Sequence, residues 1–332
     1  MALTTLLITQ RDIDWLISMK TAVRVIEDAF RAQGRGQTLM PPKVYLNLPG
    51  GIGDFRAMPA FLGTPRAAGL KWVNVHPKNR AKGLPTVMGT IIINDPATGF
   101  PLAIMDGLSV TRLRTGAAAG VAAKYLARSD ASRVGLVGCG AQAIWQLSAL
   151  AEVRRLRHVA VWGYRAGEAR AFCRRHQGQL AATLVPVSTV QACVRDAQII
   201  VTVTSARGPL VKRPWIASGT HLNAIGADAP GKQELDPAIL RDALVIVDER
   251  QQSMHGGELN VPIAKGQYRA SQIHAELGAV VLGKVRGRTR ATQITVFDST
   301  GLAIHDVALG AEIVRQATRR GVGRAIRLFD WP

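Results

Sequence analysis

The segment from Val134 to Ala143 places the tightest constraint on how this chain can fold. Residues 134–137 are typical of a buried strand, and the spacing G-x-G-x-x-A follows them at Gly138, Gly140 and Ala143. Gly138 permits a tight turn, Gly140 lets the backbone approach a pyrophosphate, and Ala143 keeps the next helix close to the strand. The amides at the start of that helix then face the phosphates. We therefore predict a dinucleotide-binding unit, the alternative being a glycine-rich turn in an unrelated α/β fold.

The chain after residue 130 alternates between strand and helix patterns. The predicted strands cover residues 134–137, 159–162, 183–187, 199–203, 221–225, 244–247 and 294–297. Apolar strands separated by helices imply a parallel sheet with right-handed crossovers. The length of 332 residues is suited to two domains. We predict an α/β protein in which residues 119–302 form a Rossmann-type NAD(P)-binding domain.

The first hundred residues have an α+β pattern and predict an antiparallel or mixed sheet. An amphipathic helix is expected at residues 11–33, and the predicted strands cover 43–62, 70–75, 87–94 and 101–105. An alanine-rich helix at 109–127 contains Gly116 and Gly120, which cost about 1 kcal/mol each relative to alanine. Close approach of a neighbouring backbone or ligand would offset that cost. The last helix, at 302–320, is expected to pack back on this part, giving a discontinuous domain of residues 1–118 with 303–332.

The charge balance is strongly basic, with 42 lysines and arginines against 23 acids and a net charge of +19. The basic residues are scattered and are not interleaved with aromatic residues, so we expect no nucleic-acid partner. A basic field would instead attract a dinucleotide and a carboxylate substrate. The three cysteines are odd in number and lack metal-ligand spacing, so neither a disulfide framework nor a metal site is expected. No apolar run approaches membrane length and no leader is recognised, which favours the cytoplasm.

The predicted strand at 159–162 bears on the choice between NAD and NADP. An acidic residue at the end of this strand would bind the ribose 2′-hydroxyl of NAD. The chain has Trp162-Gly163-Tyr164-Arg165 here instead. An arginine can bind a 2′-phosphate with two parallel hydrogen bonds, so Arg165 favours NADP, unless it is one more surface arginine.

Five further segments, taken with this motif, resemble the ornithine cyclodeaminase/μ-crystallin family. They are MPA at 58–60, GLKWVNVHP at 69–77, RLRTGAA at 112–118, GADAPGKQELD at 226–236 and VFDSTG at 296–301. The resemblance runs in order through nearly the whole chain. It implies a Rossmann domain joined to a dimerisation and substrate domain, a homodimer, and hydride transfer at the α-carbon of an amino acid or imine.

The resemblance also assigns site residues. Lys71 and Arg114 would bind the substrate carboxylate, Lys71 also being catalytic, and Asp228 would transfer the amino proton. The implied cofactor contacts are Thr86, Arg114, Thr115, Gly138, Gly140, Ala141, Gln142, Arg165, Thr204, Ser205, Gly226, Asp228, Lys232 and Ser299. The alternatives are that Arg114 forms a domain-interface ion pair, that Lys71 is a surface strand lysine and that Asp228 is an N-cap or turn residue.

One departure from the family pattern concerns the substrate. Ornithine cyclodeaminases have an acidic residue just before the Met-Pro pair, whereas Arg56 stands two residues before Met58 here, and Lys43 replaces an arginine. A cation cannot hold the distal ammonium of ornithine, and both residues look like the archaeal alanine dehydrogenase branch. Asp54 would take the acidic role if the register shifts at the turn of residues 49–53.

These observations lead to one principal prediction and two alternatives. The principal prediction is an NAD(P)-dependent alanine dehydrogenase-like enzyme or imine reductase acting on a small amino acid or imine acid. Its substrate side would use Lys43, Arg56, Lys71 and Arg114. The alternatives are an ornithine cyclodeaminase that recycles bound NAD, and a non-catalytic ligand-binding protein of the crystallin type.

Overall fold

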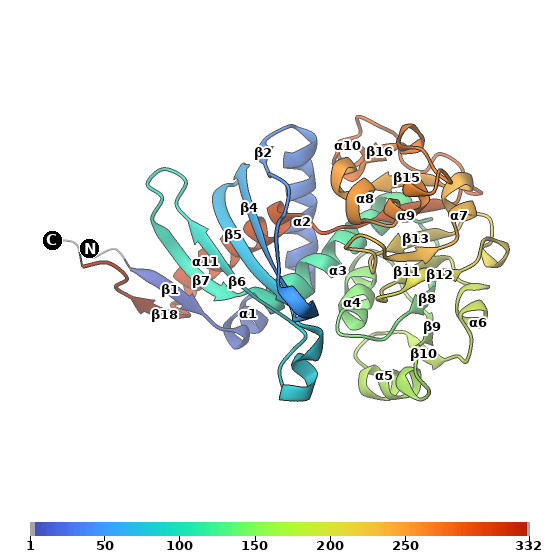
Figure 1. The fold of residues 1–332 in the computed structure, drawn as a ribbon, viewed down its shortest axis with the longest axis horizontal. Helices are drawn as coiled ribbons and strands as arrows, with labels where there is room; N and C mark the ends of the chain where they lie inside the picture. Colours follow the sequence, from blue (N-terminus) through green and yellow to red (C-terminus); the bar gives the residue numbers. More distant parts are fainter. Residues whose placement is uncertain (1–3, 331–332) are drawn as a thin grey trace. The chain divides into compact units, whose positions relative to one another are not determined.

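The computed structural model describes residues 4–330, without the side chain of Arg80. The described chain divides into two compact units, one formed by the chain up to Arg114 together with the segment from Leu302, the other by Thr115–Gly301 (Figure 1). The assignment of dimerisation and substrate binding to the first unit stays a prediction. No helix among the described residues combines the length and apolar character that a membrane crossing requires.

The first unit is a mixed sheet with helices packed against it. Its elements are β1 (Thr5–Ile8), α1 (Gln10–Leu16), α2 (Met19–Gly34), β2 (Thr38–Leu39), β3 (Val44–Asn47), β4 (Asp54–Gly63), β5 (Arg66–Val75), β6 (Val87–Asn94), β7 (Pro101–Asp106), α11 (Ala303–Arg320) and β18 (Arg324–Ile326). The sheet order is β18-β1-β7-β6-β5-β4-β2, with β3 on β4, and only the β1–β7 pair is parallel. The mixed sheet confirms the expectation for this region.

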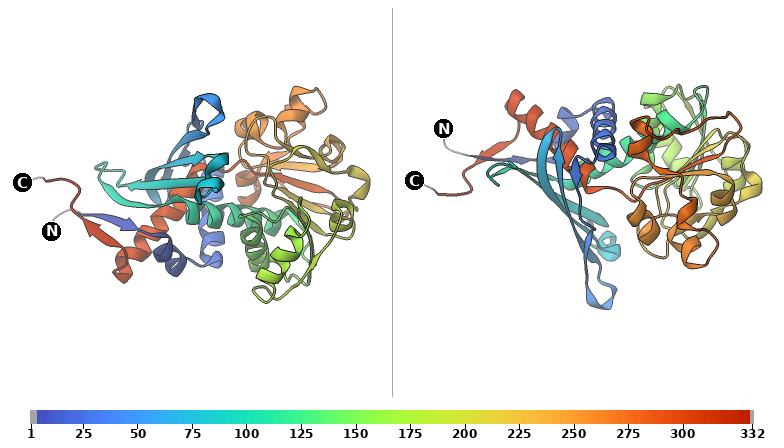
Figure 2. Two further views of the ribbon diagram at one scale, coloured as in Figure 1. Left: turned by 60° about the horizontal axis from the view of Figure 1, so that its bottom comes forward. Right: turned by 90° about the horizontal axis from the view of Figure 1, so that it is seen from above.

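The C-terminal helix α11 lies along β4, β5 and α2 (Figure 2). All residues from 303 to 310 are buried, among them the polar His305 and Asp306, and Ile313 and Ala317 continue the buried side. The final helix therefore packs back on the N-terminal sheet, as the sequence predicted, and it places two polar side chains in the interior of the unit.

The single helix predicted at 11–33 was wrong, because two helices occupy that segment. Ile17 is extended, and the Ser18 hydroxyl accepts a hydrogen bond from the Thr21 amide at the start of α2. Thr9 and Asp12 form a capping box at the start of α1. Two local caps therefore divide a segment whose hydrophobic periodicity reads as continuous.

The second unit is a parallel sheet covered by helices on both faces. Its elements are β8 (Arg133–Val137), α4 (Ala143–Val153), β9 (His158–Trp162), α5 (Glu168–His176), β10 (Thr183–Pro186), α6 (Val190–Val194), β11 (Ile199–Thr202), β12 (Arg207–Val211), β13 (His221–Ala224), β14 (Gln233–Leu235), α7 (Pro237–Asp242), β15 (Leu244–Val247), α8 (Arg250–Gly256), α9 (Asn260–Ala264), β16 (Ala275–Glu276), α10 (Leu277–Val281) and β17 (Thr295–Asp298). The order β10-β9-β8-β11-β13-β17-β15-β16, parallel throughout, begins as the doubly wound order does. The predicted Rossmann-type α/β fold is confirmed.

Alternate strand residues supply two cores, one on each face of this sheet. Ile199 and Val201 of β11 pack in one core with Leu147 of α4, whereas Ile200 packs in the other with Leu240 of α7. Apolar residues on both strand faces are typical of a covered parallel sheet.

Helix α3 (Gly107–Leu126) continues from the first unit into the second. A Cβ at Gly120 would lie 3.0 Å from the Ala149 carbonyl oxygen and 3.1 Å from the Ala149 Cβ. The glycine therefore permits α3 and α4 to pack closely, which confirms the predicted reason for its presence.

Candidate active site

Two cations share one carboxylate inside the first unit. Lys71 on β5 places its Nζ 2.7 Å from Oδ2 of Asp306, and Arg114 of α3 places its Nε 3.2 Å from Oδ1. The Lys71 and Asp306 side chains are 1% and 0% exposed, and Arg114 is nearly as well buried. The two residues predicted to bind the substrate carboxylate are thus brought together, with Asp306 between them.

The charges in this group do not balance. Burial, followed by the charge of Arg114, lowers the pKa of Lys71 to about 7, while Asp306 opposes the shift. Burial acts to raise the pKa of Asp306, but Lys71 and then Arg114 outweigh it, and the net shift is downward. When Lys71 is protonated, two buried cations face one anion. An incoming carboxylate would complete the pairing, because buried charges are stable only when paired.

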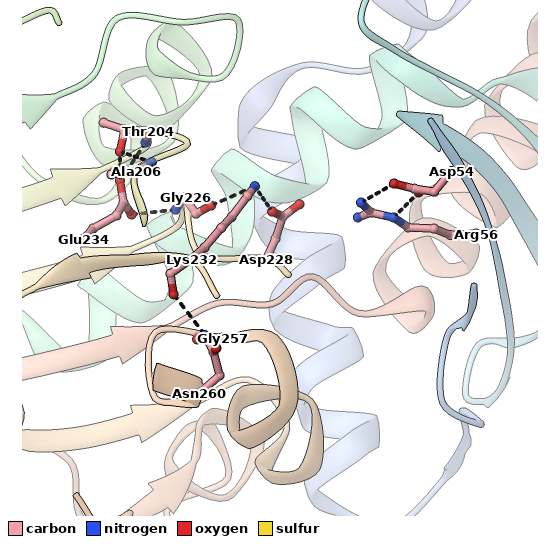
Figure 3. Close-up of polar contacts among 10 residues, drawn as sticks. All are labelled: Asp54, Arg56, Thr204, Ala206, Gly226, Asp228, Lys232, Glu234, Gly257 and Asn260. Carbon is pink, nitrogen blue, oxygen red and sulfur yellow. Dashed lines mark hydrogen bonds and ion pairs between the residues drawn. The ribbon is translucent and has the colours of Figure 1, made fainter. Parts of the chain in front are cut away.

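Arg56 and Asp54 lie together on β4. Arg56 donates from Nε to Asp54 Oδ1 at 2.7 Å and from a terminal nitrogen to Oδ2 at 3.2 Å (Figure 3). Met58 is the register partner of Lys71, and since strand side chains alternate, Arg56 shares a sheet face with Lys71. The two residues that the sequence left as alternatives are therefore partners in one ion pair.

Lys43, immediately before β3, is half-buried, and its charge contributes to the lowered pKa of Lys71. The Arg56 guanidinium carbon lies 5.2 Å from the centre of the Tyr45 ring. Of the predicted substrate residues, Lys43, Lys71 and Arg114 thus interact electrostatically, and Arg56 lies on the same sheet face as Lys71, paired with Asp54.

Sequence reasoning missed Asp306 and its neighbour His305. The His305 ring meets Phe30 edge-on, with centroids 4.5 Å apart, and burial, then Arg114, lowers its pKa to about 3. The available signal was a polar pair at buried positions of an otherwise apolar helix face. This signal identifies buried polar groups but not their partners, because Lys71 and Arg114 lie far earlier in the chain.

The glycine-rich turn of the second unit has the shape that a dinucleotide requires. Gly138 has φ 106°, and a Cβ there would lie 2.8 Å from the Val203 carbonyl oxygen. A Cβ at Gly140 would meet nothing within 4 Å, so one side of this turn is open. Ala141 and Gln142 follow, and α4 begins at Ala143. A tight turn, an open backbone edge and a helix start suit a bound pyrophosphate.

The remaining cofactor candidates of this unit follow strands that are neighbours in the sheet. Thr204 and Ser205 follow β11, Gly226 and Asp228 follow β13, and Ser299 follows β17. Because parallel strands end at one edge, these residues and the turn after β8 share the carboxyl edge of the sheet, where ligands of such folds bind.

Asp228 and Lys232 form an ion pair at this edge (Figure 3). The Lys232 Nζ also lies 3.4 Å from the Gly226 carbonyl oxygen, and the Asp228 side chain is 42% exposed. An accessible carboxylate held by a lysine is suited to exchanging a proton with a bound amine.

Arg165 lines a cavity of about 760 Å³ beyond the end of β9. Arg170 and Ser188 also line it, and neither was predicted. The nearest acid in sequence, Glu168, accepts a hydrogen bond from the Arg165 amide at 3.1 Å, which makes it a turn cap. Two arginines and a hydroxyl give this cavity an anion-binding character.

Thr86 and Thr115 complete the predicted cofactor set. Thr86 precedes β6 and its carbonyl accepts the His76 amide at 2.8 Å; Thr115 is buried in α3. Their roles toward a cofactor stay predictions. In the described part of the chain, no group of three or more His, Cys, Asp or Glu side chains could hold a metal ion.

Comparison with known proteins identifies the family. The profile of the ornithine cyclodeaminase/mu-crystallin family matches residues 4–321. The chain belongs to this family. Its sequence is 47% identical to an alanine dehydrogenase of Archaeoglobus fulgidus over 326 residues, which cover 98% of this chain and 99% of that one. The resemblance stated from the motifs is thereby confirmed.

Solved structures of family members superimpose closely. An archaeal alanine dehydrogenase dimer with bound NAD has a TM-score of 0.93 at 47% identity, over 98% of this chain and 100% of that one. The Thermococcus litoralis Delta(1)-pyrroline-2-carboxylate reductase with NADH and L-proline has a TM-score of 0.94 at 35% identity, over 97% and 100%. The Paracoccus denitrificans iminosuccinate reductase with NAD⁺ has a TM-score of 0.92 at 31% identity, over 98% and 99%. The chain is an oxidoreductase of this family, as the sequence predicted.

Proposed function

We propose that this enzyme interconverts a small amino acid and its imine or 2-oxo acid with NAD(P)(H). Reduction consumes an imine acid, NAD(P)H and a proton, and yields the amino acid and NAD(P)⁺; with a 2-oxo acid, ammonia is also consumed and water is released. The observation that carries the proposal is the buried group of Lys71, Asp306 and Arg114, with two cations to one carboxylate. The glycine-rich turn at the carboxyl edge of the parallel sheet, with its open side at Gly140, supports the proposal.

Lys71 and Arg114 have the role of binding the substrate carboxylate. Arg114 supplies a permanent charge, whereas Lys71 carries its charge below its pKa of about 7. Asp306 holds both side chains in place, so that a bound carboxylate meets positioned donors. Burial makes each of these contacts stronger than the same contact in water.

Asp228 has the role of exchanging the proton of the substrate nitrogen. Lys232 pairs with its carboxylate and favours the ionised form, which accepts a proton during amine oxidation and returns it during imine reduction. The nicotinamide, when bound, supplies or accepts the hydride. Gly138, Gly140 and the start of α4 would hold the pyrophosphate.

NADP is the proposed preferred nucleotide. Arg165 and Arg170 line one cavity with Ser188, and Glu168 is engaged by a backbone amide. A 2′-phosphate offers a doubly charged partner to the two guanidinium groups. Relatives with solved structures carry NAD or NADH, so the preference needs its own measurement.

A short or anionic side chain is the proposed substrate feature. Arg56, held by Asp54, leaves a basic group beside Lys71 for a small acid such as alanine or for a second carboxylate. The alternative, ornithine cyclodeamination, is favoured only by the presence of Asp54. The paired Arg56 cancels the negative charge that a distal ammonium would need.

A homodimer is the proposed assembly. The sheet face opposite Lys71 exposes Val44, Leu46 and Trp72, with Phe55 stacked on Trp72 at 5.3 Å. Contiguous exposed apolar side chains mark association surfaces. Light scattering after size exclusion should give twice the chain mass, and Trp72→Glu should shift the protein toward the monomer. A monomeric wild-type protein would contradict this assembly.

The proposed activity is tested by reduced-nicotinamide absorbance. NADPH and NADH are supplied separately with short 2-oxo acids plus ammonia or methylamine, with cyclic imine acids and with iminosuccinate. Oxidation with one acceptor class supports the proposal and identifies the substrate. Proline formed from ornithine with catalytic NAD, and no oxidation with any acceptor, would support the cyclodeaminase alternative instead.

A further inference from the structure

A buried glutamate connects two turns at the carboxyl edge of the parallel sheet. Glu234 lies on β14 and is fully buried. Its Oε1 accepts the Thr204 amide and the Thr204 hydroxyl, both at 2.7 Å, and its Oε2 accepts the Gly226 amide at 2.9 Å (Figure 3). Thr204 follows β11 and Gly226 follows the adjacent β13, so one carboxylate ties together two cofactor-candidate turns.

Two more buried carboxylates extend this connection to the next strand. Glu258 accepts the amides of Glu234, at 3.0 Å, and of Leu235, at 2.7 Å. Asp298, the last residue of β17, accepts the Glu258 amide at 2.9 Å. Glu234, Glu258 and Asp298 thus link the ends of β11, β13 and β17.

This arrangement leaves no room for a side chain at position 226. A Cβ at Gly226 would lie 2.1 Å from the Thr204 carbonyl oxygen and 2.6 Å from Oε1 of Glu234. The two turns are therefore in backbone contact, and the carboxylate fixes their separation. Burial also raises the pKa of Glu234, and no lysine or arginine among residues 4–330 forms an ion pair with it. A group buried at such cost is held by its three donors.

We infer that Glu234 is a positioning residue for the cofactor site: it holds the Thr204 turn against the Gly226 turn, and so sets the orientation of Asp228. The inference rests on the proposed function. Only a carboxylate accepts all three donors at once. An amide in its place directs an NH₂ group at one of them, either the Thr204 pair or the Gly226 amide.

The first test compares Glu234→Gln with the matched control Glu249→Gln. Glu249 also accepts two backbone amides in this unit, those of Gln251 and Gln252, but it caps α8. The dissociation constants of NADH and NADPH are measured by fluorescence, with the melting temperature of each variant. We expect Glu234→Gln to weaken nucleotide binding about tenfold, the equivalent of one lost buried hydrogen bond. We expect Glu249→Gln to lower the melting temperature without changing binding.

A double-mutant cycle keeps the inference testable if Glu234→Gln folds poorly. Thr204→Val removes one donor to Glu234, and Thr204→Ser retains both. The inference is supported if Thr204→Val weakens nucleotide binding and Thr204→Ser restores it. It is also supported if the effects of Thr204→Val and Glu234→Gln on the dissociation constant are not additive in the double variant. Wild-type protein that binds neither nucleotide overturns the proposed function itself. If the wild-type protein binds nucleotide and both Glu234→Gln and Thr204→Val bind it as tightly, only the role of Glu234 is overturned.

Discussion

Oδ2 of Asp306 lies 2.7 Å from Nζ of Lys71, and both side chains are almost completely shielded from solvent. Asp306 comes from the C-terminal helix and Lys71 from a strand 235 positions earlier, and Asp306 also pairs with Arg114. The two cations predicted to bind substrate therefore share a counter-ion that lies outside the sequence motifs from which their role was predicted. This shared counter-ion gives the first prediction.

Asp306→Asn should destabilise the protein by about 3 kcal/mol, because it leaves two buried cations without a counter-ion. Urea denaturation measures the loss. Asp130→Asn is the control, because Asp130 and its partner Arg128 are 59% and 36% exposed, and it should cost less than about 1 kcal/mol. Equal stability of the Asp306 variant and wild type would show that the cations are paired by other means.

Lys71 should make carboxylate binding depend on pH. Its pKa of about 7 means that the ammonium is lost as pH rises above 7, so the affinity for an unreactive carboxylate such as propionate should fall from pH 6 to pH 9. Lys71→Arg should flatten this profile, because its charge does not titrate there. Inhibition constants across this range provide the measurement; identical slopes for the two proteins would exclude Lys71 as the titrating group.

The same shift has a consequence for stability. A lysine that titrates near pH 7 when folded, and near 10.5 when unfolded, binds fewer protons in the folded state between those values. Its contribution therefore makes stability rise with pH across that window.

The two motif glycines should respond differently to alanine. Gly140→Ala should keep the fold, because its Cβ meets nothing within 4 Å, but it should weaken nucleotide binding about tenfold or more by blocking the backbone's approach. Gly138→Ala should also lower the melting temperature, since φ is 106° and the Val203 oxygen lies 2.8 Å from the added carbon. Nucleotide titration and thermal melts separate the two effects. Undiminished binding by Gly140→Ala would place the pyrophosphate elsewhere.

Arg165→Ala should reduce the preference for NADPH over NADH about tenfold, because it removes one bidentate partner of the 2′-phosphate. Arg170→Ala should act in the same direction, and the double variant should bind both nucleotides about equally. The ratio of kcat/KM values with the two nucleotides is the readout. A ratio unaffected by either change would leave Arg165 as a surface arginine.

His305 should contribute to acid unfolding. Burial, then Arg114, lowers its pKa to about 3, whereas an unfolded histidine titrates near 6.5. The folded state therefore binds fewer protons between these values, so this contribution is intact above pH 6.5 and is lost as pH falls toward 3. His305→Leu should lose less stability than wild type between pH 7 and pH 5 in urea denaturation. Parallel losses would assign acid sensitivity to other groups, such as His221.

The parallel sheet and the turns at its carboxyl edge were predictable because their sequence signals are local. The Gly138 turn, the strand ends and the reason for Gly120 each depend on neighbouring residues in sequence or on one periodic pattern. Asp306 and Glu234 were not predictable in this way. The partners of Asp306 are distant in the chain, and those of Glu234, which lie 30 and 8 residues before it, are turns that only the folded sheet brings together. The position of a buried acid in the sequence does not reveal which cation or amide it meets. The break at Ser18 was missed because a helix cap is a single side-chain hydrogen bond within a continuous hydrophobic pattern.

Because the first unit is discontinuous in sequence, its synthesis is completed only after that of the second unit. Strands β1 to β7 leave the ribosome first, the whole second unit follows, and α11 emerges last. Since domains fold as units while the chain emerges, residues 115–301 are able to fold before the first unit has its last helix. Until α11 is synthesised, it cannot cover β4 and β5, and Lys71 and Arg114 have no Asp306 carboxylate with which to pair. A chain truncated before residue 303 would therefore lose, with one helix, both the cover of its first sheet and the carboxylate that pairs with Lys71 and Arg114.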